Sequence, residues 1–114
     1  MSAEINWSYG ETDTVSANTT DEDNIVQVTS TKKLTLKRVT VHFPSGVNYQ
    51  LRLQVFRGAD QVVPDSGYLT GDDSTITVEC NVTFIGGEYI KLKRTNTDTT
   101  NSHSYYILLE GVLE

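Results

Sequence analysis

Residues 75–84, near the middle of the chain, alternate between polar and apolar side chains without a break. The apolar positions are Ile76, Val78, Cys80, Val82 and Phe84, and the polar positions between them are Thr75, Thr77, Glu79, Asn81 and Thr83. A period of two is the pattern of a β-strand with one buried face and one face in water. At ~3.3 Å per residue this strand would be roughly 33 Å long. Gly86 and Gly87 follow it and predict a tight hairpin, with Ile90 and Leu92 on the buried face of the returning strand.

The same period recurs along most of the chain, and no segment shows the periodicity of an amphipathic helix of ordinary length. Further strands are predicted by Ile5, Trp7 and Tyr9, by Ile25, Val26 and Val28, by Tyr49, Leu51, Leu53 and Val55, and by Val62 and Val63 after a turn at Gly58 and Asp60. Between Leu34 and Phe43 the phase changes, which predicts a β-bulge near Lys37 and Arg38 or a break into two strands. We therefore predict an all-β protein, an antiparallel β-sandwich or jelly-roll-like fold (or a barrel) of about eight strands, with the strand order left open.

The first part of the chain is acidic. Residues 11–24 hold no Lys or Arg and carry five of the chain's acidic residues, Glu11, Asp13, Asp21, Glu22 and Asp23. This segment predicts a long loop or arm, so we divide the chain into an N-terminal arm with a short strand over residues 1–24 and a β-sandwich domain over residues 25–114. We also expect the acidic segment to lie against a basic cluster, in its own subunit or in a neighbouring one. The two clusters are Lys32, Lys33, Lys37 and Arg38, and Lys91, Lys93 and Arg94.

The last strand is apolar on both faces from Tyr105 to Leu109. A strand with two apolar faces needs cover on both sides. One side is the core of a sandwich, and the other meets a loop, the N-terminal arm or another subunit.

Candidate sites for chemistry are few. Asp65, Asp72 and Asp73 could bind a cation on loops, although Asp72 and Asp73 are equally suited to capping turn amides. His42 and His103 are the two histidines, and neither belongs to a motif that supplies a nucleophile with a base. Cys80 shares the buried parity of its strand, which favours an inert core thiol. We expect no enzymatic activity, no cofactor and no bound metal.

Charge and hydropathy limit the partners that we expect. The net charge is −6, and from Ile25 onward nine basic residues balance nine acidic ones. This neutral body predicts neither nucleic acid nor an anionic membrane as a partner. The N-terminus shows no secretory signal, and no run is long enough to span a bilayer, so a soluble chain is expected.

Residues 25–114, with the hairpin-rich stretch LRLQVFRGADQVVPDSGYLTGDDSTITVE and a C-terminus inside a strand, resemble the small β-sandwich accessory proteins of viral heads. These are the decoration, turret or spike components of tailed phages and related viruses. The resemblance implies a non-enzymatic virion protein, made in the host cytoplasm and often trimeric, that stabilises a shell of major capsid protein. From local pattern we select as contacts Trp7 and Tyr9 in the arm and Tyr105, Tyr106, Ile107 and Leu108 at a subunit interface. The alternative is a carbohydrate- or receptor-binding β-sandwich, in which exposed aromatics such as Tyr68, Tyr89 and Tyr106 would stack on sugar rings.

Overall fold

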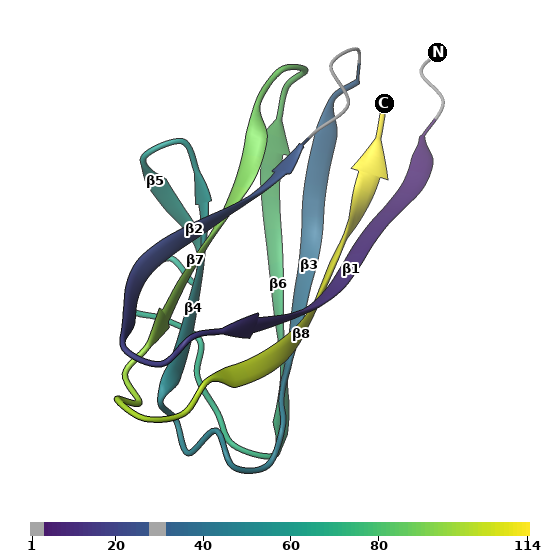
Figure 1. The fold of residues 1–114 in the computed structure, drawn as a ribbon. Helices are drawn as coiled ribbons and strands as arrows, with labels where there is room; N and C mark the ends of the chain where they lie inside the picture. Colours follow the sequence, from purple (N-terminus) through teal and green to yellow (C-terminus); the bar gives the residue numbers. More distant parts are fainter. Residues whose placement is uncertain (1–3, 28–31) are drawn as a thin grey trace.

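The computed structural model describes residues 4–27 and 32–114, which form eight β-strands in two sheets (Figure 1). The strands are β1 Ile5–Val15, β2 Thr19–Gln27, β3 Leu34–Phe43, β4 Leu51–Arg57, β5 Asp60–Val63, β6 Ser74–Phe84, β7 Tyr89–Asn96 and β8 His103–Leu113. Nowhere in these two ranges does a helix occur that is long and apolar enough to cross a membrane. The all-β prediction is confirmed. Val28, which we assigned to a strand, lies outside the described residues.

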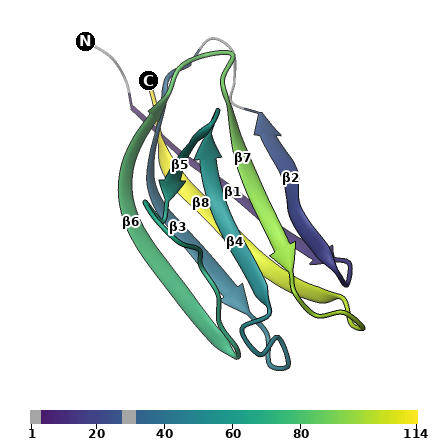
Figure 2. The same cartoon turned by 90° about the vertical axis from the view of Figure 1, so that its left-hand side faces the viewer.

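Two four-stranded antiparallel sheets face each other (Figure 2). Sheet A has the order β1-β8-β3-β6, and sheet B has the order β2-β7-β4-β5. The chain passes from one sheet to the other at every connection except the β4–β5 hairpin. This strand order, two interlocked Greek keys, is that of a jelly roll.

The predicted Gly86-Gly87 hairpin is wrong in one respect. The turn is present, and Gly87 has a φ of +91° that favours glycine. However, β6 pairs with β3 in sheet A, whereas β7 pairs with β2 and β4 in sheet B. The turn therefore spans the two layers of the sandwich, because period-two patterning shows which face of a strand is buried and not which strand is its neighbour.

The core lies between the sheets and follows the predicted parities. Fully buried side chains come from both layers and include Val15, Leu34, Leu36, Val39, Val41, Phe43, Leu51, Phe84, Ile90, Tyr105, Ile107 and Leu109. The predicted bulge in β3 is confirmed, because the pairing of β3 with both β6 and β8 shifts between Leu36 and Arg38. The shift returns Val39, Val41 and Phe43 to the core face that Leu34 and Leu36 also occupy. Tyr49 falls in the turn before β4 with a positive φ and is exposed, so it is not part of that strand.

The acidic segment is not the predicted loop. Among the described residues, β1 pairs along its whole length with β8, and β2 pairs with β7, so residues 11–15 and 19–24 belong to edge strands of the two sheets and only residues 16–18 form a turn between them. The boundary that we placed between residues 24 and 25 falls inside β2. The acids are tolerated in strands because several of them are paired with partners in β7 and β2, as described below.

The position of β8 in sheet A explains why this strand has apolar side chains on both faces. Tyr105, Ile107 and Leu109 point into the sandwich and are at most 1% exposed. Tyr106, with 40% of its surface exposed, and the half-buried Leu108 lie on the other side, the outer face of sheet A. Because β8 lies between β1 and β3, its outward side chains occupy the middle of that face.

Candidate functional site

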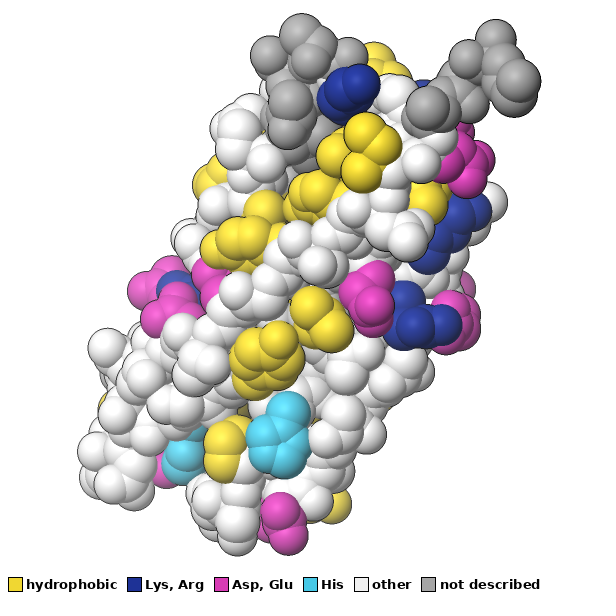
Figure 3. All heavy atoms as spheres, turned by 90° about the vertical axis from the view of Figure 1, so that its right-hand side faces the viewer, with side chains coloured by type: hydrophobic (Ala, Val, Ile, Leu, Met, Phe, Trp, Pro, Cys, Tyr) yellow, Lys and Arg dark blue, Asp and Glu magenta, His cyan; other side chains and the backbone are white. Residues whose placement is uncertain are grey.

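The outer face of sheet A carries an apolar strip, which we define as Tyr106, Leu108 and Val112 of β8. Figure 3 shows apolar side chains in a band across this face. In antiparallel pairs, residues directly opposite each other share a face, and Leu108 lies opposite Gly10 of β1. A Cβ at Gly10 would be 2.6 Å from the hydroxyl oxygen of Tyr106, so the absence of a side chain lets the tyrosine lie across β1. The strip is therefore a flat apolar surface and not a pocket.

Charged and polar groups border the apolar strip. Arg38 donates a hydrogen bond from Nε to Glu79 at 2.8 Å, and its Nη1 lies 3.8 Å from Glu110. His42 is paired in register with Tyr106, and its Nδ1 is 2.9 Å from the hydroxyl of Thr75. Beside the strip, where β3 bulges, is a shallow hollow of about 420 Å³, lined by Asn6, Trp7, Ser8, Lys37, Arg38, Glu110, Gly111 and Val112. Together these residues make a broad surface of mixed polarity.

The fold places the six predicted contact residues in three different environments. Tyr106 and Leu108 lie on the outer face of sheet A, and their role at an interface stays a prediction. Tyr105 and Ile107 point into the core and do not reach the surface of the chain, because adjacent residues of a strand point to opposite faces. Trp7 and Tyr9 are half-buried and pack against the core from β1.

The acidic segment meets the second basic cluster within the same chain, as one of our two alternatives had it. Arg94 of β7 forms ion pairs with Asp13 of β1 and Glu22 of β2, and Lys93 lies 3.4 Å from Asp23. The Arg94 side chain is only 9% exposed, and its Nη1 also donates to the hydroxyl oxygen of Tyr105 at 3.1 Å. Arg94 thus joins strands of both sheets along one open side of the sandwich.

The proton affinities of these groups follow from their contacts. Burial would lower the pKa of Arg94, but its hydrogen bonds to Tyr105 and Asp13 outweigh burial, and the pKa is raised. Burial raises the pKa of Asp13, but the hydrogen bonds from Arg94 and the Thr14 amide outweigh that effect, and the net pKa is lowered. Burial raises the pKa of Tyr105 to about 12, against the opposing effect of Arg94. All three groups therefore keep their ordinary charge states at neutral pH.

Sequence reasoning missed this buried arginine, although a signal was present. Arg94 continues the buried parity of Ile90 and Leu92, and Asp13 continues the parity of Trp7 and Tyr9. Opposite charges on the inward parity of two strands indicate a buried ion pair, because an unpaired charge there would be too costly to bury.

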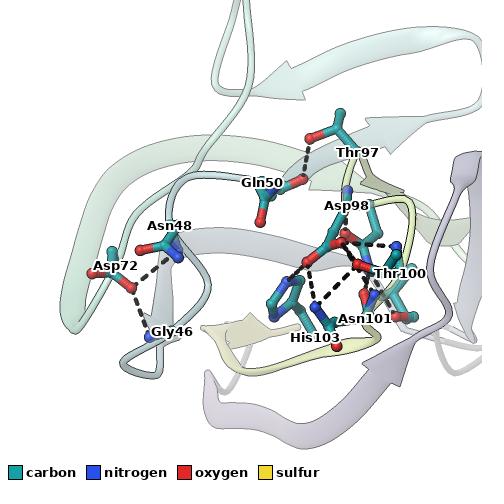
Figure 4. A network of polar contacts seen from close by, with 11 residues as sticks. Gly46, Asn48, Gln50, Asp72, Thr97, Asp98, Thr100, Asn101 and His103 are labelled. Atoms are coloured by element: carbon teal, nitrogen blue, oxygen red, sulfur yellow. Dashed lines mark hydrogen bonds and ion pairs between the residues drawn. The ribbon is translucent and has the colours of Figure 1, made fainter.

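A second polar network organises the connection between β7 and β8 (Figure 4). One carboxylate oxygen of Asp98 accepts hydrogen bonds from the amides of Thr100 and Asn101 at 2.9 and 3.1 Å, and the other lies 2.8 Å from Nε2 of His103. These contacts lower the pKa of Asp98, with the Thr100 amide as the largest cause and His103 next. We had placed His103 in a polar loop; it is the first residue of β8, and its contact with Asp98 helps to fix the turn before that strand.

Asp72, one of the three aspartates considered for a cation, caps a turn instead. Oδ1 of Asp72 accepts from the amides of Gly46 and Asn48 at 2.9 and 3.0 Å, as Figure 4 also shows, so the capping alternative is confirmed for this residue. Within the two described ranges, no group of three or more His, Cys, Asp or Glu side chains is placed to hold a metal ion. Asp65 and Asp73 therefore gain no support as ligands.

Cys80 lies half-buried on β6, with its Sγ 3.5 Å from the carbonyl oxygen of Leu36. Burial first, and then the charge of Glu79, raise the pKa of this thiol, so it is protonated at neutral pH. That environment agrees with the predicted inert thiol and is unlike that of an activated nucleophile.

Aromatic residues contact the cationic side chains of sheet B in a way that we did not foresee. Phe56 of β4 lies with its ring centroid 5.8 and 5.2 Å from the ammonium groups of Lys91 and Lys93. Arg52 similarly covers the ring of Tyr68 at 4.5 Å, so one of the tyrosines that we selected for sugar stacking already has a cation on its ring. Tyr89 and Tyr106 belong to different sheets. The three tyrosines do not form one platform within a single sheet.

The fold recurs among solved structures. The crystal structure of FLHE matches with a TM-score of 0.52 and 10% identity, over 96% of this chain and 98% of that one. A chain from the structure of infectious bursal disease virus, Gx strain, matches with a TM-score of 0.50 and 8% identity, over 98% of this chain and 32% of that one. A chain from nora virus matches with a TM-score of 0.40 and 12% identity, over 99% and 60%. This chain thus spans about a third of the length of the bursal disease virus chain.

No protein-family model and no curated protein sequence matches this chain. At identities of 10 and 8%, the likeness to the FLHE and bursal disease virus chains shows the fold alone. The strand order defines the class of eight-stranded jelly-roll β-sandwiches.

Proposed function

We propose that this chain is a non-enzymatic virion structural protein, a decoration or stabilising component that binds a shell of major capsid protein at the capsid surface. The observation that carries the proposal is the apolar strip, because it places a tyrosine and two aliphatic side chains in the middle of a broad, flat sheet face. Surfaces of this shape suit another protein better than a small molecule, which needs an enclosed cavity.

The surroundings of the apolar strip fit a protein partner. Tyr106 offers a large apolar ring together with a hydroxyl group, a combination that is common at the centre of protein interfaces. Arg38, Glu79 and Glu110 form a largely exposed, already paired charge cluster on the β3 side of the strip, with Glu110 lying between Leu108 and Val112. Paired charges beside an apolar centre are common in protein interfaces.

Two further observations support a structural role. The jelly roll also forms part of a chain in the infectious bursal disease virus structure. The groups that an enzyme would use as base or nucleophile are engaged in structural contacts here, since His103 contacts Asp98, His42 contacts Thr75 and the Cys80 thiol is protonated.

The proposal is tested on particles released by cells that produce the chain. After density-gradient purification, immunoblotting and mass spectrometry should find the chain in the particle band at a fixed ratio to the main shell protein. A chain that stays with the soluble proteins at the top of the gradient would overturn the proposal. Binding to a glycan array without particle association would favour the carbohydrate-binding alternative.

Substitution of the apolar strip tests the surface itself. The double variant Tyr106→Ser with Leu108→Ser should fold, because both side chains point away from the core, but it should leave the particle fraction. Thr12→Ser, on β1 opposite Tyr106, is the matched control and should remain bound. A particle-bound double variant would place the contact elsewhere on the chain.

A further inference from the structure

Each sheet ends in two edge strands, and an edge strand offers unpaired backbone groups to any other strand of suitable pattern. Three of the four edges carry features that discourage pairing with a second copy. β1 contains Glu11 and Asp13, and β2 contains three consecutive acids at positions 21–23. Arg94 and Lys93 pair with three of these five acids, so an excess of negative charge remains and two copies meeting along either strand would repel each other. β5 has only four residues and is followed by Pro64.

The fourth edge, β6, has none of these features. It is eleven residues long and pairs only with β3 among the described parts of the chain. Its one charged residue, Glu79, is neutralised by Arg38. The inward side chains Ile76, Val78, Cys80 and Val82 are only half-buried, and at this edge lies a hollow of about 320 Å³, lined by Val62, Pro64, Asp65, Val78, Glu79 and Cys80. β6 is therefore a long, neutral edge beside incompletely covered apolar side chains.

We propose that β6 pairs antiparallel with β6 of a second copy of this chain, about a two-fold axis that passes through Cys80. This register sets Val78 opposite Val82 of the second copy and Ile76 opposite Phe84, on the face that is incompletely covered in one chain. On the other face it sets Thr77 opposite Thr83. Apolar residues therefore face apolar residues on the inward side, and threonine faces threonine on the outward side. Sheet A of one copy and sheet A of the other join into one continuous sheet.

Charge and polarity favour this register over those centred on Glu79 and Val78. With the axis at Cys80, Glu79 lies opposite Asn81 of the second copy. Oδ1 of Asn81 accepts a hydrogen bond from Nζ of Lys37 at 3.1 Å, so each Glu79 would approach an ammonium group of the other chain. An axis at Glu79 would set two carboxylates face to face, and an axis at Val78 would set the apolar Val82 opposite the polar Ser74.

The pairing can be measured by mass. Light scattering after size exclusion should give twice 12.7 kDa at high concentration, with dissociation on dilution. A persistent monomer would overturn the pairing. A mass of three times 12.7 kDa, the trimer that the resemblance implies, would overturn it as well, because one two-fold strand pair joins only two chains.

A charge exchange tests the register. Thr77→Glu with Thr83→Glu places carboxylates opposite each other twice in the pair and should raise the dissociation constant by about tenfold. In Thr77→Lys with Thr83→Glu, a lysine lies opposite a glutamate of the second copy at both contacts. The dissociation constant should therefore fall below the native value. Thr12→Glu with Thr14→Glu, at the opposite edge of sheet A, is the matched control and should leave the constant unchanged. Equal effects of the two β6 variants would contradict this register.

Cys80 supplies a second, covalent readout of the same register. The register brings the two thiols into a direct cross-strand position, where Cβ atoms are about 4.5–5.5 Å apart, close to disulfide geometry. At alkaline pH, which offsets the raised pKa of Cys80 by forming thiolate, and with oxidised glutathione as the oxidant, the two thiols lose two electrons and two protons to form one disulfide, and two glutathione thiols are released. Native chain should give a covalent dimer linked at Cys80, whereas Thr77→Glu with Thr83→Glu should give little. Equal cross-linking of both, as expected from random collision, would contradict the pairing.

Discussion

Arg94 of β7 donates a hydrogen bond across the sandwich to the hydroxyl oxygen of Tyr105 on β8, at a distance of 3.1 Å. β7 belongs to sheet B and β8 to sheet A, so this contact joins the two layers directly. The same guanidinium holds Asp13 of β1 and Glu22 of β2. The open side of the sandwich between the two N-terminal strands is thus bridged by one cation, and a hydrogen bond of 2.6 Å from the side-chain amide of Asn24 on β2 to Glu11 on β1 also joins them.

Replacement of Arg94 should destabilise the fold. Arg94→Met keeps the apolar volume but leaves Asp13 and Glu22 without their cation, and we expect the free energy of unfolding to fall by about 2–3 kcal/mol. Arg94→Lys keeps the charge but cannot contact three partners in the same geometry, so it should lose about half as much. Urea denaturation followed by circular dichroism measures both. A native-like Arg94→Met would show that the network adds nothing to stability.

Tyr105 should ionise at unusually high pH. Its folded pKa, raised to about 12, lies above the ordinary value of 10.0, so its contribution to stability is complete below pH 10.0 and is lost as the pH rises towards 12. Ultraviolet titration of tyrosinate should show a late step that Tyr105→Phe lacks. An unchanged late step in Tyr105→Phe would assign that step to another tyrosine.

Much of this fold could be predicted from residue periodicity, because a period of two reports burial directly. The bulge in β3 and the buried faces of β6 and β7 were visible in this way. The sheet to which each strand belongs was not visible, because Gly86-Gly87 suits a turn between sheets as well as a hairpin. The acidic segment was misjudged for another reason. Asp13 and Glu22 look solvated until Arg94, 81 and 72 residues further along the chain, is placed beside them.

The same limit applies to the candidate surface. The two apolar faces of β8 correctly indicated a strand that is covered on one side by the core, but they did not show which of Tyr105 and Tyr106 points inward. That choice depends on the register with β1 and β3, which is a long-range property. Tyr106 and Leu108 could be selected as contacts from sequence, whereas the exclusion of Tyr105 and Ile107 required the structure.

Acid should weaken the connection between β7 and β8 through Asp98. The pKa of this carboxylate is lowered from 3.8 by the amide of Thr100 and by His103, so its contribution to stability is complete above pH 3.8 and is lost as the pH falls below it. Asp98→Asn cannot ionise, so its urea midpoint should lie below that of native protein at neutral pH, and the gap should shrink below pH 3.8. A gap that stays constant with pH would show that the charge of Asp98 is unimportant.

Two strand glycines should differ sharply in their tolerance of alanine. A Cβ at Gly111 of β8 would collide with the carbonyl oxygen of Thr35 and lie 3.1 Å from Cα of Leu36, so β3 itself would have to move at its bulge. We expect Gly111→Ala to lower the free energy of unfolding by about 1–3 kcal/mol. A Cβ at Gly10 of β1 would meet mainly the end of the Tyr106 side chain, which can rotate into solvent, so Gly10→Ala should cost well under half as much. Thermal and urea unfolding of the two variants measures the difference. Because both glycines lie in paired strands and both gain the same methyl group, equal losses would mean that the backbone contact at Gly111 is not what requires glycine there.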